Sequence, residues 1–115
     1  MSMEAAKLTY EVKNHSMVVH LPKELDHHNS QNLKQETEQI MDETYINQII
    51  FDFSNTNFMD SSGIGALLGR YKRMSAVGGK VVVYGVNERV KRLLNLSGIY
   101  KIVKQYETKE QAMKG

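Results

Sequence analysis

The residues best suited to chemistry lie together in the segment Asp60-Ser61-Ser62-Gly63. The segment follows the nearly continuous apolar run Gln48–Phe53, which is typical of a strand covered on both faces, and it precedes an amphipathic stretch. It is therefore expected to join a buried strand to a helix start. Backbone N–H groups at a helix start lack intrahelical partners and can meet a ligand or a partner. Serine at this position is also a common helix cap, and the position alone favours that simpler role.

Two glycines follow the serines within the first turn of the predicted helix. Gly63 and Gly65 each disfavour a helix by about 1 kcal/mol relative to alanine. Their presence is explained if a neighbouring element or a partner must approach the backbone closely.

The spacing around the serines excludes the common catalytic motifs. A hydrolase nucleophile elbow needs a glycine two residues before the serine. Met59 occupies that position for Ser61, and Asp60 occupies it for Ser62. The dinucleotide fingerprint fails because Leu68 occupies its third glycine position, and no phosphate-binding Gly-Lys-Ser/Thr run is present. No base is placed near Ser61. The sequence therefore predicts no catalytic residues and no enzyme.

The histidines give no metal-binding pattern. The chain has no cysteine, which excludes disulfides and thiolate ligands. His27 and His28 are adjacent, so they cannot share a helix face, and they are expected in a loop at a helix start. His15 and His20 fall in a predicted hairpin with no acid pair nearby. Neither a metal nor a cofactor is predicted.

Hydrophobic periodicity predicts alternating strands and helices along the chain. The first half is expected to hold an antiparallel hairpin of strands at 8–12 and 17–21, a helix at about 26–44 capped by Asp26 or Asn29, and a strand at 48–53. A helix at about 62–77, with the apolar face Ile64, Leu67, Leu68 and Tyr71, and a strand at 81–84 are expected next. The C-terminal part is expected to hold a helix capped by Asn87 and ended by Gly98, a short strand at 102–103, and a last helix after the capping box Thr108–Gln111. Strand–helix–strand units make the later strands parallel, and the hairpin makes the sheet mixed. One α/β domain over residues 1–115 is expected, with helices packed against a mixed central sheet.

Composition and charge indicate a soluble cytoplasmic protein. The chain is 41% hydrophobic and 24% charged, and no apolar run is long enough to cross a membrane. Residues 1–60 hold 4 Lys/Arg and 10 Asp/Glu, whereas residues 61–104 hold 9 Lys/Arg and one acid. This asymmetry either attracts an acidic partner or only keeps the protein soluble. Without interleaved aromatics or a nucleic-acid motif, direct nucleic-acid binding is not expected.

Three segments carry a resemblance to a known family. They are Glu24-Leu25-Asp26-His27-His28, Phe58–Lys72 and Val90–Gly98. Together they resemble the anti-sigma factor antagonists of the STAS domain family, in the sporulation branch of endospore-forming bacteria. The resemblance is well matched over about residues 8–105, and Met59–Gly63 is its most specific part. Nothing functional is carried onto residues 1–7 or onto the tail after Gln105, which match least.

The resemblance implies a phosphorylation-switched regulator of transcription. The unphosphorylated form would bind an anti-sigma factor that is also a serine kinase, and so free a sporulation sigma factor. That kinase would phosphorylate Ser61 and end the interaction, and a PP2C-type phosphatase would restore it. The alternative is an antagonist of a general stress-response anti-sigma factor. The residues expected to contact the partner are Asp26, Asp60, Ser61, Ser62, Gly63 and Ile64.

Overall fold

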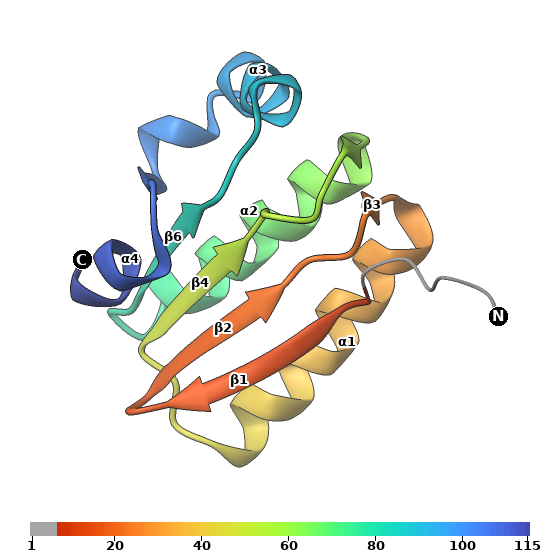
Figure 1. Ribbon diagram of the computed structural model, residues 1–115. Coiled ribbons are helices and arrows are strands. Elements are labelled where there is room, and N and C mark those ends of the chain that lie inside the picture. Colours follow the sequence, from red (N-terminus) through yellow and green to blue (C-terminus); the bar gives the residue numbers. More distant parts are fainter. Residues whose placement is uncertain (1–6) are drawn as a thin grey trace, which may run out of the picture.

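A five-stranded sheet with four α-helices forms the fold in the computed structural model, which describes residues 7–115 (Figure 1). Residues 1–6, for which no functional role is expected, lie outside the described part. In chain order the elements are β1 (Thr9–Lys13), β2 (Ser16–His20), β3 (Glu24–Leu25), α1 (His27–Glu43), β4 (Gln48–Asp52), β5 (Phe58–Met59), α2 (Ser61–Ser75), β6 (Lys80–Tyr84), α3 (Glu88–Ser97), the 3-10 turn η1 (Ile99–Lys101), β7 (Lys104–Tyr106) and α4 (Lys109–Lys114).

The sheet is mixed, as the sequence predicts. Its strand order is β1-β2-β4-β6-β7. Only β1 runs antiparallel to its neighbour, because a short turn joins it to β2. The pairs β2–β4, β4–β6 and β6–β7 are all parallel, and α1, α2 and α3 lie in the connections between them. The carboxyl ends of the four parallel strands β2, β4, β6 and β7 therefore meet at one edge of the sheet.

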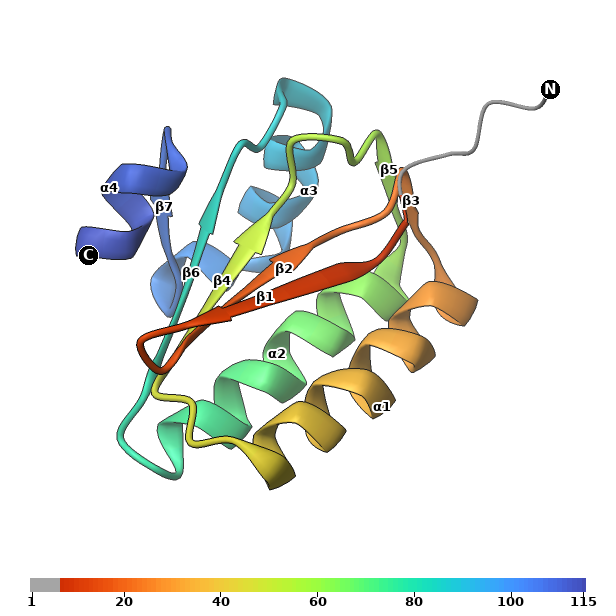
Figure 2. The same ribbon diagram turned by 60° about the horizontal axis from the view of Figure 1, so that its bottom comes forward.

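The sheet separates two apolar cores of unequal size. Side chains of a strand alternate between its faces, so Ile49 and Phe51 join the larger core with residues of α1, α2 and α3. Ile50 points the other way and packs in a smaller core with Ala112 of α4. Figure 2 shows α1 and α2 side by side under one face and α4 on the other. Every residue of β4 is buried, as expected of a strand covered on both faces.

The last strand differs from its prediction. Ile102 and Val103 were expected to form it because they are apolar, yet the strand is β7, just beyond them. Val103 is instead buried in the larger core after the turn η1, while Ile102 is exposed. β7 lies at the edge of the sheet and pairs only with β6. An edge strand is held by backbone hydrogen bonds to one neighbour, so it can form from polar residues that the apolar pattern does not reveal.

The apolar face predicted for α2 contains a buried charge that the pattern does not reveal. Of the four predicted residues only Leu67 is fully buried, whereas Arg70 is 4% exposed. The Arg70 guanidinium donates to Oε1 of Glu38 at 2.6 Å and to Oγ1 of Thr37 at 3.4 Å, both on α1. A buried charge is tolerated when it is paired and hydrogen-bonded in this way. The ion pair thus fixes α2 against α1.

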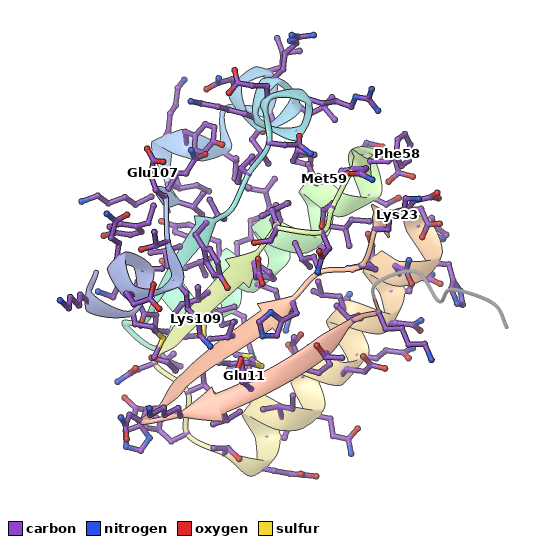
Figure 3. All side chains as sticks on the ribbon, in the orientation of Figure 1. Glu11, Lys23, Phe58, Met59, Glu107 and Lys109 are labelled. Carbon is purple, nitrogen blue, oxygen red and sulfur yellow. The ribbon has the colours of Figure 1, made fainter. Side chains whose placement is uncertain are left out.

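A histidine joins three strands on the sheet face that carries α4. His20 Nδ1 lies 2.6 Å from Oδ2 of Asp52 on β4, and its Nε2 lies 2.8 Å from Oε1 of Glu11 on β1. Glu11 also accepts a hydrogen bond from Lys109 of α4 at 3.1 Å (Figure 3). The expectation that His20 has no acid pair nearby is wrong, because both acids come from neighbouring strands.

The arrangement favours an imidazolium held between two carboxylates. Burial alone would lower the pKa of His20, but the hydrogen bonds and charges of Glu11 and Asp52 outweigh it and raise that pKa. Hydrogen bonds from His20 and Lys109 lower the pKa of Glu11. Burial would raise the pKa of Asp52, but hydrogen bonds from Ser54 and His20 outweigh burial and lower it.

We expect the free energy of unfolding to fall as the pH rises through the raised pKa of His20. The stabilisation is fully present below the unfolded-state pKa of histidine, about 6.5, and is lost above the folded-state pKa. Urea unfolding at a series of pH values above this point should show the fall in the native chain and a flatter profile in His20→Gln. Parallel profiles for the two chains would contradict the expectation.

Candidate functional site

Two short strands place the starts of α1 and α2 side by side. β3 pairs in parallel with β5, and a single residue separates each of these strands from the helix that follows it (Figures 1 and 3). The amide of Asn57 donates to the carbonyl of Lys23 at 2.8 Å, and the amide of Asp60 donates to the carbonyl of Leu25 at 3.4 Å. Two-residue strands carry no alternation, so the sequence pattern could not reveal this pairing. It nevertheless brings together the predicted segments at Asp26 and at Asp60.

Both aspartates act as helix caps. The carboxylate of Asp26 accepts the amide of Asn29 at 2.9 Å, which confirms Asp26 rather than Asn29 as the cap of α1. Oδ1 of Asp60 accepts the amides of Ser62 at 2.9 Å and of Gly63 at 3.4 Å. The serines expected at the cap therefore lie just inside the helix, because the carboxylate of Asp60 takes the free amides that a serine hydroxyl would otherwise bind.

Ser61 is the exposed member of the site. It is the first residue of α2, and its hydroxyl has no hydrogen-bond partner among residues 7–115. Ser62 is half-buried, and its Oγ lies 3.3 Å from Nδ1 of His27 on α1. His27 was expected in a loop, but it is the first residue of α1 and faces the second helix start. Its position directly after the cap Asp26 is the signal that could have found it.

The His27–Ser62 contact connects the starts of α1 and α2. It resembles a catalytic base–nucleophile pair but lacks the third group that orients the base. A nucleophilic serine needs a base that is itself oriented by a third group. The neighbouring carboxylate of Asp26 instead accepts the amide of Asn29, and no carboxylate bonds to His27 in the part of the chain that the structure describes. The geometry therefore offers an accessible hydroxyl at Ser61 rather than an activated one.

The two glycines of the first turn have different surroundings. A Cβ at Gly63 would lie 2.4 Å from Cγ of Met59 and 3.0 Å from the carbonyl oxygen of Leu25. Gly63 is buried, and these close atoms belong to β5 and β3. The neighbouring element that was predicted to approach the backbone at this glycine is therefore the β3–β5 pair. A Cβ at Gly65 would have nothing within 4 Å, which leaves an open surface over the first turn of α2. Ile64, between them, is half-buried against the larger core.

Residues 7–115 contain neither a cluster of metal ligands nor a helix able to span a membrane. Their histidine, aspartate and glutamate side chains form no group of three placed to hold a metal ion. Across the same residues, no helix has the length and apolar character needed to span a bilayer.

Comparison with known proteins identifies the class. Residues 7–112 match the model of the STAS domain, so the chain belongs to the STAS domain family. Within that family its sequence and fold are those of the SpoIIAA type of anti-sigma factor antagonist, a group of regulatory proteins. The resemblance and the fold expected from the sequence are thereby confirmed.

The similarity extends over nearly the whole chain. The anti-sigma F factor antagonist of Paenibacillus polymyxa is 37% identical over 108 residues, with 92% of each chain covered. The anti-sigma-B factor antagonist of Listeria monocytogenes is 29% identical over 52 residues, covering 45% of this chain and 46% of that relative.

Two solved structures of SpoIIAA share the fold. Its unphosphorylated form is 29% identical with a TM-score of 0.83 and 93% of both chains covered. The phosphorylated form from Bacillus is 28% identical with a TM-score of 0.75, covering 93% of this chain and 96% of that one.

We expect opposite effects from adding one methyl group at the two glycines. Gly63→Ala should destabilise the fold by about 1–3 kcal/mol, because the methyl group would overlap Met59 and the Leu25 carbonyl. Gly65→Ala should stabilise it by up to about 1 kcal/mol, because alanine favours a helix and has free space there. Urea denaturation measures both changes, and equal stabilities of the two variants would refute the predicted contrast.

Proposed function

We propose that this chain is an anti-sigma factor antagonist switched by phosphorylation of Ser61. In the cytoplasm, the unphosphorylated form binds an anti-sigma factor that is also a serine kinase, and a sporulation sigma factor is released. The kinase transfers the γ-phosphoryl group of ATP to Ser61, and a PP2C-type phosphatase removes it. The observation that carries the proposal is the exposed hydroxyl of Ser61 at the first position of α2, which is unpaired in the described part of the chain.

The electrostatics of the helix start suit a switch that leaves the fold intact. Phosphorylation adds about −1.5 to −2 charges. The positive end of the α2 dipole tolerates negative charge there, so the phosphorylated chain is expected to stay folded. A partner surface that had covered a neutral hydroxyl would have to bury a dianion next to Asp60. An unpaired buried charge costs several kcal/mol, enough to end binding without a large conformational change.

An exposed apolar and basic surface lies beside the site and supports protein docking. Phe58 of β5 is 47% exposed, and α3 packs next to β5. On α3 the exposed residues Arg89, Leu93 and Leu96 recur at helical spacing and therefore share one face. We expect this face, together with Asp26, Ser61 and Ser62, to meet a partner that offers apolar contacts and acidic side chains.

The similarities favour a sporulation sigma factor over a general stress factor. Two relatives that match across most of the chain are anti-sigma F factor antagonists, whereas the match to an anti-sigma-B factor antagonist covers less than half. Pull-downs with the two corresponding anti-sigma kinases, run side by side, decide between them.

Incubation with the cognate kinase and ATP should add one phosphate to the chain. Peptide mass mapping should place it on Ser61. Ser61→Ala should remain unmodified, whereas the matched variant Ser62→Ala should still be phosphorylated. A phosphate confined to Ser62 would refute the assignment.

Phosphorylation should weaken kinase binding by more than about a hundredfold, which corresponds to about 3 kcal/mol. Ser61→Ala should bind as the unmodified chain does. Ser61→Asp should bind less well because it adds a negative charge, but its effect should be smaller than that of phosphorylation because a carboxylate carries less charge than a phosphate. Titration calorimetry with the kinase in its ADP state measures these affinities. Equal affinities for the phosphorylated and unphosphorylated chains would end the proposal.

A further inference from the structure

A groove of about 280 Å³ separates the first turns of α1 and α2, beside the site. Its walls include His27, Ser30 and Lys34 on α1, and Ser62 and Gly65 on α2. The docking surface proposed above shares only Ser62 with it. Its lining and its position relative to Ser61 together indicate a ligand.

The first indication is an unsatisfied hydroxyl in the groove wall. Ser30 is only 6% exposed, and its Oγ has no hydrogen-bond partner within residues 7–115. Serine inside a helix often donates to the carbonyl four residues earlier. That carbonyl, on Asp26, accepts the amide of Ser30 at 2.8 Å, while the hydroxyl itself stays unpaired. The oxygen is enclosed, so the Ser30 side chain has to rotate about χ1 to donate into the groove. Because an unpaired buried hydroxyl is unfavourable, an acceptor bound in the groove would favour that rotation.

The second indication is the charge of the lining. Among the described residues that line the groove none is acidic, and Lys34 forms no ion pair with a carboxylate of residues 7–115. His27 and Ser62 add further groups able to donate. Several donors around one cation suit an oxyanion with more than one acceptor oxygen, such as a phosphate.

A phosphate on Ser61 would need donors of this kind. Amides at a helix start usually bind phosphate, but Asp60 already accepts those of Ser62 and Gly63. The carboxylate of Asp60 would also repel a second negative group beside it. The phosphate is therefore directed away from the cap and toward other donors.

Gly65 leaves the path to the groove open. Residues four apart on a helix are neighbours, and a helical side chain covers the turn that precedes it. A side chain at position 65 would therefore lie against Ser61, only about 40° away around the helix axis. Since Gly65 has no side chain and its surroundings are empty, a phosphate on Ser61 can reach over it into the groove.

We propose that the groove between α1 and α2 receives the phosphate carried by Ser61, with Lys34 and the hydroxyl of Ser30 as its main donors. This inference rests on the proposed function, because it takes Ser61 as the phosphorylated residue. Phosphorylation then does two things. It adds charge at the partner-facing surface, and it satisfies a hydroxyl that is unpaired in the bare chain.

The test uses the full chain with phosphoserine encoded genetically at position 61, so that no kinase is required. Titration followed by ³¹P NMR gives the second pKa of the phosphate, which is about 6 in an unconstrained phosphoserine. The chain is compared with Lys34→Gln and with the matched control Lys72→Gln, a lysine exposed on α2 outside the groove.

We expect Lys34→Gln to raise the second pKa of the phosphate by about half a unit or more, because a nearby cation favours the dianion. Lys72→Gln should leave it unchanged. Equal values in the two variants would overturn the proposal. A kinase that fails to modify Ser61 would instead refute the proposed function and leave this result standing.

Ser30→Ala provides an independent measurement. Removing the unpaired hydroxyl should raise the Tm of the unphosphorylated chain. In the phosphoserine chain the hydroxyl is hydrogen-bonded to the phosphate, so the same substitution should raise the Tm less or lower it. The same change in Tm in both chains would show that the phosphate does not reach Ser30.

Discussion

The parallel pairing of β3 with β5 is the contact on which the site depends. It involves only two residues on each strand, yet it places the starts of two long helices next to each other. The pair also sets the close approach of Met59 and the Leu25 carbonyl to α2, which only a residue without a side chain tolerates at Gly63. Close packing of the β3–β5 pair against the start of α2 therefore requires glycine at position 63 and also sets the position of Ser61.

Asp60 links this geometry to the electrostatics of the proposed phosphorylation of Ser61. By accepting the first free amides of α2, it stabilises the helix start and leaves the Ser61 hydroxyl unused by the fold. The same carboxylate removes the donors that a helix start usually offers to a phosphate. In the proposed switch, a phosphate on Ser61 would therefore depend on groups from α1, and the pairing of α1 with α2 would matter for the phosphorylated form as well as for stability.

Features set by neighbouring residues along the chain could be predicted from the sequence. The capping box at Thr108 and the left-handed Gly98 after α3 are both present, because caps and helix ends depend on residues a few positions apart. The segment with the two serines was also found in this way. Features set by packing were missed: Arg70 is buried because Glu38 lies opposite on α1, and His20 meets its acids through strand register. Ser30 likewise gains its place in the groove only from the packing of α1 on α2.

The two borders of the sheet have a consequence for association. A border strand offers free backbone N–H and C=O groups to which another chain can add. Here β7 is only three residues long and begins with Lys104, and β1 ends with Lys13 and has an exposed, largely polar surface. Short length and charge both disfavour the addition of a foreign strand. Both borders of the sheet thereby resist amyloid-like growth through added strands.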